Sequence, residues 1–127
     1  EGTLGRIMEE EKKVFYFITN YPLETKPFYT MPQEDMRYSR SFDLGCKGLE
    51  IASGSQRIHD KKLLIERVEK CGLNPRDFES YLKAFRYGMP PHGGFGFGIE
   101  RFLMQLLRLN NIRECILFPR DRNRLTP

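Results

Sequence analysis

The segment from Gly93 to Leu107 constrains the fold of this chain more than any other part of its sequence. It alternates glycine with phenylalanine up to Gly98, continues as Ile99-Glu100-Arg101, and becomes mostly apolar from Phe102 onward. Such alternation is typical of a strand that a ligand or another backbone approaches closely. The apolar periodicity predicts a helix, whose N-terminal end favours anions. A ligand that is flat at one end and polyanionic at the other, such as a nucleoside triphosphate, would fit both halves.

Composition limits the classes of protein to which the chain can belong. Its 127 residues suffice for one domain or part of one, and 39% hydrophobic with 30% charged residues argue against disorder. The formal charge of +4 is compatible with phosphate-bearing partners but is weak evidence for them. The absence of a long apolar run or of a signal-peptide pattern predicts a cytoplasmic protein that does not enter a membrane. Because the sequence starts at Glu1 without methionine, we expect a fragment of a longer protein.

The three cysteines predict neither a disulfide framework nor a zinc site. Cys46, Cys71 and Cys115 lie far apart, and the sequence contains no C-x-x-C pair. Reduced and mostly packed thiols are therefore expected.

The other elements follow from periodicity and turn residues. The order of helices and hairpin-connected strands favours an antiparallel β-sheet backed by helices, an α+β fold. The expected elements are a helix over 3–13, a buried strand over 14–19, a proline-rich loop region, a hairpin over 41–58 turning at Lys47-Gly48, a helix over 61–71 capped by Asp60, a helix starting at Asn74-Pro75, the glycine-rich strand with its helix, and a short strand over 115–118.

A second group of polar residues lies within the hairpin. Ser53 and Arg57 fall on one side of a regular strand, whereas Glu50 falls on the other. A bulge or local twist between Glu50 and Ser53 would bring all three to one face, and we predict one there. A carboxylate and a hydroxyl are hard oxygen ligands for Mg²⁺, and an arginine can clamp a carboxylate. The alternative is a solvated sheet face with an ion pair between Glu50 and Arg57.

Other interpretations of these residues are weaker or stay open. The spacing of Gly94, Gly96 and Gly98 does not match a Gly-x-Gly-x-x-Gly cofactor loop, and the chain order offers no parallel β-α-β unit. Glu100 and Arg101 could alternatively be a solvent-facing pair at a helix start. For the isolated His59 and His92 a structural role is favoured over metal binding.

Taken together, these motifs resemble a known family. GFGFGIERF is similar to motif 3 of the class II aminoacyl-tRNA synthetases. FDLGCKGLEIASGSQRIHD, FRYGMPPHGGFG and NIRECILFPRDRNRLTP are similar to aspartyl-tRNA synthetases of the archaeal and eukaryotic type. The similarity extends from about Tyr21 to Pro127. Asparaginyl-tRNA synthetases share much of this sequence similarity. Their C-terminal ends usually differ after Phe-Pro-Arg, where this chain has Asp121 and then Arg124-Leu125-Thr126-Pro127.

The resemblance implies a role for each matching residue. Glu50 would hold Mg²⁺ and contact ATP, Ser53 would contact the metal and L-aspartate, and Arg57 would bind the carboxylate of L-aspartate. The ATP-binding turn would consist of Gly98, Ile99, Glu100 and Arg101. Glu50 and Arg101 would be the catalytic residues.

The implied activity is that of an aspartate-tRNA ligase with Mg²⁺ as cofactor. The aspartate α-carboxylate would attack the α-phosphorus of ATP, giving aspartyl-adenylate, and the aspartyl group would pass to the 3′ end of tRNA(Asp). Positioning and charge neutralisation would be the main contributions of the protein. The full-length enzyme is expected to be a homodimer.

The resemblance also implies what residues 1–127 lack. Motif 1, motif 2 and an anticodon-binding domain are not visible, so the chain is expected to be the C-terminal portion of a class II catalytic domain with little or no activity alone. Two alternatives stay open: an asparaginyl-tRNA synthetase, and a synthetase-like binding or regulatory module without activation chemistry.

Overall fold

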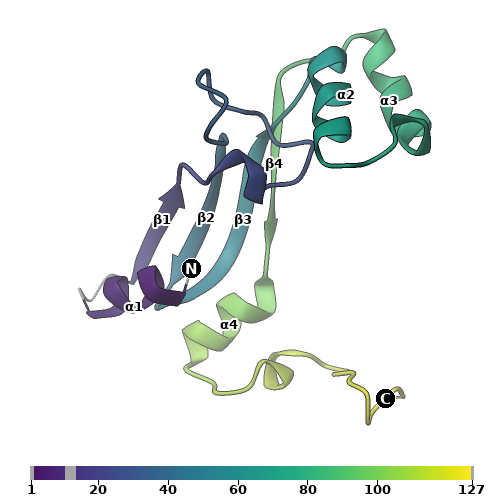
Figure 1. Cartoon of the computed structure of the whole chain (residues 1–127). Helices are drawn as coiled ribbons and strands as arrows, with labels where there is room; N and C mark the ends of the chain where they lie inside the picture. Colours follow the sequence, from purple (N-terminus) through teal and green to yellow (C-terminus); the bar gives the residue numbers. More distant parts are fainter. Residues whose placement is uncertain (1, 11–13, 127) are drawn as a thin grey trace. The chain divides into compact units, whose positions relative to one another are not determined.

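The described part of the chain contains a four-stranded sheet accompanied by short helices. The computed structural model describes residues 2–10 and 14–126. The strands are β1 (Phe15–Thr19), β2 (Ser41–Cys46), β3 (Leu49–Arg57) and β4 (His92–Phe97), and they lie in the order β1-β2-β3-β4. The sheet is antiparallel (Figure 1), so the predicted α+β fold is confirmed.

The α-helices lie close to the predicted positions. They are α1 (Gly2–Glu10), α2 (Lys61–Lys70), α3 (Glu79–Ala84) and α4 (Ile99–Leu107). Short 3₁₀ helices are η1 (Leu23–Thr25), η2 (Pro75–Phe78), η3 (Phe85–Tyr87) and η4 (Ile112–Cys115). The predicted end of the first helix at Lys12-Lys13 lies outside the described residues. None of the described helices is long and apolar enough to cross a membrane.

The chain divides into two compact units, which are described separately. The first unit comprises Glu1–Phe17, Leu44–Ala52 and Phe97–Pro127, and the second comprises Ile18–Asp43 and Ser53–Gly96. Each of the four strands therefore contributes residues to both units. The first unit contains α1 and α4, and the second contains α2 and α3.

Local signals in the sequence explain the hairpin and the start of α2. Lys47 and Gly48 both adopt positive φ angles, 46° and 81°, as a tight two-residue turn between β2 and β3 requires. The carboxylate of Asp60 accepts a hydrogen bond from the backbone N–H of Leu63 at 2.7 Å. This contact caps α2 as predicted.

The core of the second unit lies between α2, α3 and the end of β3. Ile58 and Leu64 are fully buried and form one apolar cluster with Leu82 and Phe85. The helix predicted to start at Asn74-Pro75 is divided into η2, α3 and η3, and the Asn74 side chain accepts from the N–H of Arg76.

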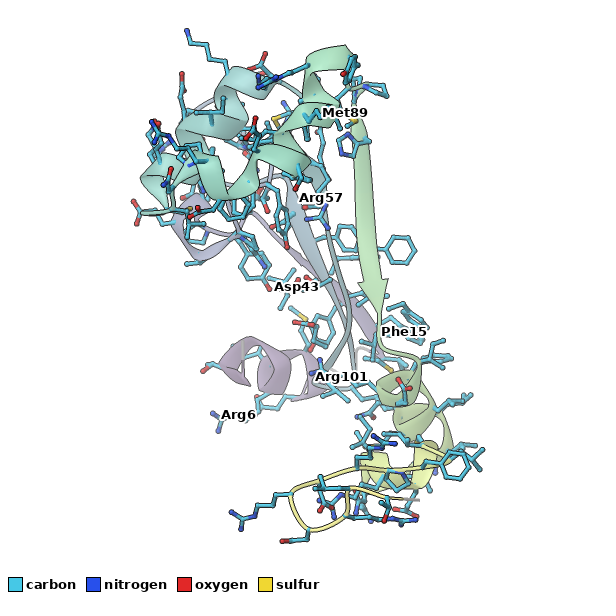
Figure 2. All side chains as sticks on the ribbon, turned by 90° about the vertical axis from the view of Figure 1, so that its right-hand side faces the viewer. Arg6, Phe15, Asp43, Arg57, Met89 and Arg101 are labelled. Carbon is cyan, nitrogen blue, oxygen red and sulfur yellow. The ribbon has the colours of Figure 1, made fainter. Side chains whose placement is uncertain are left out.

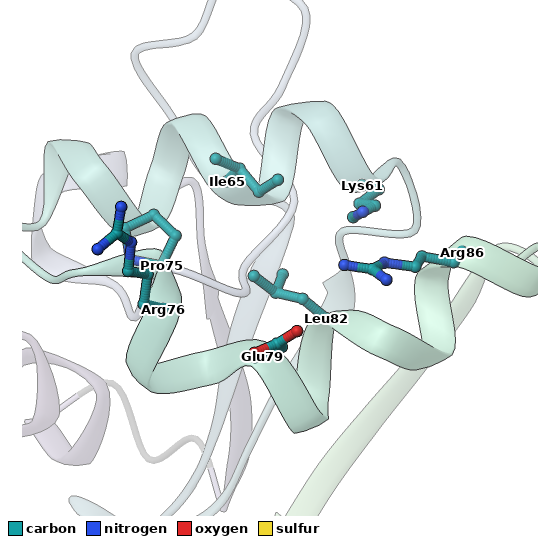
Figure 3. Close-up of a pocket in the computed structure, with 7 residues that line it drawn as sticks. All are labelled: Lys61, Ile65, Pro75, Arg76, Glu79, Leu82 and Arg86. Atoms are coloured by element: carbon teal, nitrogen blue, oxygen red, sulfur yellow. The ribbon is translucent and has the colours of Figure 1, made fainter.

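A hollow of about 390 Å³ opens between α2 and α3 (Figure 3). Lys61 and Arg86 lie near one another in the close-up, Arg76 lies at the opposite end, and the Glu79 carboxylate is between these ends. The lining residues are Lys61, Ile65, Pro75, Arg76, Glu79, Leu82 and Arg86.

Three expectations about the elements need correction. β1 is not a buried strand, because Phe15 is 54% exposed and the other residues of this edge strand are exposed or half-buried. No strand forms over 115–118: Asn111 caps η4 instead, and Leu117 is 84% exposed. The three cysteines are free as expected, but Cys71 is exposed rather than packed.

Candidate functional site

The first unit brings Glu50 and Arg101 together. Arg101 Nη1 donates a hydrogen bond to the backbone oxygen of Glu50 at 3.0 Å and lies 3.5 Å from its carboxylate Oε1. The side chains of Arg101 and Glu50 are 47% and 38% exposed, so a ligand can reach both. This contact joins β3 to the first turn of α4 and was not predicted from the sequence.

Gly98 fixes the junction between β4 and α4. Its N–H donates to the backbone oxygen of Ile51 at 2.7 Å, and its own oxygen accepts from Phe102 N–H at 2.9 Å. A Cβ at Gly98 would lie 3.3 Å from Cδ of Arg101, which is tighter than ordinary packing. Glycine therefore lets the Arg101 stem pass close to the backbone. Ile99 and Glu100 are exposed on the same turn.

The second unit brings Ser53 and Arg57 to one polar hollow of about 260 Å³. Gly54 and Ser55, which lie between them, line the same hollow, so the shared face of Ser53 and Arg57 stays a prediction. The lining residues are Lys26, Pro27, Tyr29, Thr30, Ser41, Ser53, Gly54, Ser55, Arg57 and Gly96. The predicted bulge between Glu50 and Ser53 stays a prediction, since β3 is continuous from Leu49 to Arg57 while Ile51 and Ala52 are both buried.

The Arg57 guanidinium stacks on the ring of Tyr29, with 4.3 Å between Cζ and the ring centroid. It forms no ion pair within the described residues. A planar guanidinium held in this way can present its N–H fork to a carboxylate. Figure 2 labels Arg57 of β3 and Asp43 of β2, two charged residues of this unit.

Arg57 also borders a second, more apolar hollow of about 550 Å³, lined by Phe28, Tyr29, Phe78, Tyr81, His92 and Gly93. Burial raises the pKa of the Tyr81 hydroxyl, and the positive charge of Arg57 partly opposes that rise. His92 Nδ1 lies 2.9 Å from the backbone oxygen of Pro90, consistent with the structural role expected for this histidine.

The sequence analysis did not predict a role for Lys26 or Asp43. Lys26 lines the polar hollow, and Asp43 is its ion-pair partner. Lys26 Nζ lies 3.3 Å from Asp43 Oδ2, and the Asp43 side chain is only 5% exposed. Burial opposes ionisation of Asp43, yet the pKa of its carboxyl is lower than usual. Hydrogen bonding by the Ser53 and Tyr21 hydroxyls and the nearby ammonium group outweigh the effect of burial. The sequence contains a signal that could have singled out Asp43, namely an acidic residue at a core-facing position of β2.

Glu50 and Ser53 each carry an oxygen donor of the kind that binds Mg²⁺. Glu50 offers an accessible carboxylate in the first unit, and Ser53 offers an exposed hydroxyl in the second. The described residues contain no group of three or more His, Cys, Asp or Glu side chains suited to hold a metal by themselves. Mg²⁺ typically needs only one or two carboxylates when substrate phosphates supply other ligands.

Comparison with known proteins identifies the protein family of this chain. The family model described as "tRNA synthetases class II (D, K and N)" matches residues 3–122. The chain therefore belongs to the class II tRNA synthetases of this group.

Individual relatives and solved structures show which enzymes of this family the chain is similar to. The chain is 57% identical to an aspartate–tRNA(Asp) ligase from Thermococcus kodakarensis over 100% of its own length and 30% of the relative's length. A solved structure described as a putative aspartyl-tRNA synthetase from Leishmania major superposes with a TM-score of 0.92 at 41% identity, covering 99% of this chain and 25% of that one. An asparaginyl-tRNA synthetase structure from Pyrococcus horikoshii gives a TM-score of 0.90 at 37% identity, covering 100% and 31%. The chain thus spans less than a third of each protein compared.

Proposed function

We propose that the chain is the C-terminal portion of the catalytic domain of an aspartate–tRNA ligase. The observation that carries this proposal is the polar hollow lined by Ser53 and by Arg57, whose guanidinium forms no ion pair within the described residues. The whole of this chain also matches part of an aspartate–tRNA(Asp) ligase. The relatives are much longer than this chain, so an upstream segment would supply motifs 1 and 2 and the anticodon-binding domain. The full-length protein would act as a homodimer in the cytoplasm.

Each site residue has a role that its environment supports. Arg57 would bind a carboxylate of L-aspartate, and the exposed Ser53 hydroxyl would contact the substrate and Mg²⁺. Arg101 would exchange its contact with the Glu50 carboxylate for ATP phosphate and adenine, because that ion pair is half-exposed and weak. Glu50 would then be released toward the metal and ATP. Gly98, Ile99 and Glu100 would complete the ATP-binding turn at the start of α4.

The reaction follows from positioning rather than from a protein nucleophile. With L-aspartate held by Arg57 and Ser53, its α-carboxylate would attack the α-phosphorus of ATP and release pyrophosphate. The aspartyl group would then pass to the 3′-terminal ribose of tRNA(Asp). Bound Mg²⁺ would neutralise phosphate charge and help to orient the phosphates. Arg101 would stabilise the charge that develops during transfer.

The first prediction concerns Arg57→Ala in the full-length protein. We expect aspartate-dependent exchange of pyrophosphate into ATP to lose about 10- to 100-fold in kcat/KM for aspartate, because a charge-assisted contact is worth roughly 1.5–3 kcal/mol. Arg76→Ala is the matched control, since Arg76 lies in the same unit but outside the polar hollow. Unchanged exchange in Arg57→Ala would contradict the proposed site.

The asparaginyl alternative is retained because an asparaginyl-tRNA synthetase has nearly the same fold. Arg57, which has no anionic partner among the described residues, favours an acidic substrate side chain over a neutral one. Exchange supported by asparagine and not by aspartate would establish the alternative. Failure of the full-length protein to bind ATP with Mg²⁺ would favour a module without activation chemistry.

A further inference from the structure

The hollow between α2 and α3 is a concave surface to which the proposed reaction gives no role. Its volume of about 390 Å³ lies in the range of sites that hold a small ligand or a few side chains of a partner. It shares no lining residue with the polar hollow of Ser53 and Arg57. All its lining residues belong to the second unit, so the hollow is complete within that unit.

The floor of this hollow is apolar and is continuous with the core of the second unit. Leu82 is only 6% exposed and belongs to the buried cluster. Ile65 is half-buried and packs against the same cluster, and Pro75 is half-buried at the start of η2. An apolar side chain of a partner that covers this floor would be removed from water, which favours binding.

The charged residues of the hollow are mostly cationic. Lys61, Arg76 and Arg86 carry the positive charges, against the single carboxylate of Glu79, which gives a formal charge of +2. Within residues 2–10 and 14–126, none of these four side chains forms an ion pair. Figure 3 shows Lys61 and Arg86 near one end, Arg76 at the other and Glu79 between them. Cations without a partner at both ends favour an anionic occupant.

The lining also indicates which kind of anion fits. Among the described residues that line the hollow there is no aromatic side chain, whereas sites for single-stranded nucleic acid typically stack bases on aromatic rings. A continuous row of phosphates would also pass the Glu79 carboxylate, which repels it. A peptide with two separated carboxylates and an apolar side chain between them matches both the cationic ends and the apolar floor.

We propose that the hollow between α2 and α3 binds an acidic segment of a partner protein. One carboxylate of the segment pairs with Arg76, the other pairs with Arg86 and Lys61, and an apolar side chain covers Leu82 and Ile65. The Glu79 carboxylate can accept a hydrogen bond from a backbone N–H of the segment. This binding is independent of the proposed reaction, since it uses none of the residues assigned to aspartate or ATP.

The distance between the cationic ends sets the length of the segment. Arg76 and Arg86 are ten positions apart on a helical stretch, which corresponds to about 15–20 Å along its axis. Five extended residues cover about 14 Å, and alternate side chains share one face. The long side chains of arginine and glutamate can bridge the remainder. The probe is therefore the peptide Glu-Ser-Leu-Ser-Glu, whose two acids and leucine lie on one face.

Fluorescence anisotropy of the fluorescein-labelled probe with the full-length protein tests the proposal. We expect saturable binding that weakens as salt is added. Arg76→Gln combined with Arg86→Gln should weaken it at least about tenfold, because each exposed ion pair contributes about three- to fivefold. Lys62→Gln combined with Lys70→Gln is the matched control, since both lysines are exposed on α2 outside the hollow. This control should bind as the wild type does.

Reversal of charge separates specific docking from general attraction. Arg76→Glu combined with Arg86→Glu should lose the acidic probe and bind Lys-Ser-Leu-Ser-Lys instead. Glycine in place of the leucine of the acidic probe should weaken binding to the wild-type protein at least about fivefold, because the floor would lose its apolar contact.

Three results would overturn the proposal. One is the absence of saturable probe binding to the wild type at concentrations up to about 1 mM. Another is an equal loss of probe affinity in the two glutamine double variants. The third is that labelled decauridine, and not the peptide, loses affinity when Arg76 and Arg86 are replaced, which would make the hollow an RNA site. Aspartate-dependent exchange takes no part in these measurements, so a failure of the proposed function is detected separately.

Discussion

At the scale of single residues, Gly54 and Gly96 differ in why glycine is needed. A Cβ at Gly54 would lie 2.7 Å from the Phe42 ring and from Phe95 Cβ, so two aromatic residues occupy the space that a side chain would need. A Cβ at Gly96 would meet no atom within 4 Å, although Gly96 lines the polar hollow. Gly54 therefore serves packing, whereas Gly96 keeps space open beside the candidate site.

This contrast predicts opposite effects of two alanine substitutions. Gly54→Ala should lower the free energy of unfolding by about 1–3 kcal/mol, the usual cost of overpacking. Gly96→Ala should leave stability nearly unchanged but weaken binding of substrate or nucleotide. Urea unfolding and equilibrium dialysis on the full-length protein measure the two quantities. Equal stability of the two variants would show that the space at Gly54 is not limiting.

At the scale of elements, helix caps connect sequence to structure most directly. Asp60 should contribute about 1 kcal/mol to the stability of α2, because its carboxylate satisfies the N–H of Leu63. In Asp60→Ala we expect faster amide hydrogen exchange in the first turn of α2, with α4 unaffected. Asp60→Asn, which can still cap, is the control and should restore most of the protection. Equal exchange in Asp60→Ala and the wild type would contradict this role of the cap.

Local chemistry explains which elements were predictable from the sequence. The hairpin turn at Lys47-Gly48 and the caps at Asp60 and Asn74 depend on neighbouring residues, and the structure confirms all of them. The strand expected over 115–118 was wrong, because apolar residues form a strand only where a pairing partner exists. Asn111 instead starts a 3₁₀ turn at that place.

The candidate site was predictable only in part from the sequence, because some of its contacts join residues far apart in the chain. Residue types singled out Ser53 and Arg57, and both line one hollow. The contact of Arg101 with Glu50 and the pair of Lys26 with Asp43 join residues 51 and 17 positions apart. Such pairs depend on tertiary structure, so a local pattern can single out one member, as the acid at a core-facing position of β2 does, but not its partner.

At the scale of the whole molecule, α4 has an apolar composition that the described residues do not cover. No residue of this helix is buried, and both Leu106 and Leu107 are 60% exposed. Farther along the chain, Leu117 and Phe118 are 84% and 57% exposed. Exposed apolar surface of this kind usually marks an interface. The proposed upstream part of the catalytic domain is the occupant that the length of the relatives favours.

The polypeptide of residues 1–127 should therefore self-associate, whereas the full-length protein should not aggregate. We expect the isolated polypeptide to sediment as a concentration-dependent mixture and to bind an apolar fluorescent dye strongly. Leu106→Glu combined with Leu107→Lys should reduce both effects in the isolated polypeptide, because charged side chains would replace two exposed apolar ones on α4. The same double substitution should destabilise the full-length protein, in which these positions would face the upstream segment. A monomeric isolated polypeptide without dye binding, together with a full-length protein indifferent to the double substitution, would show that α4 faces solvent and would contradict the proposed domain organisation.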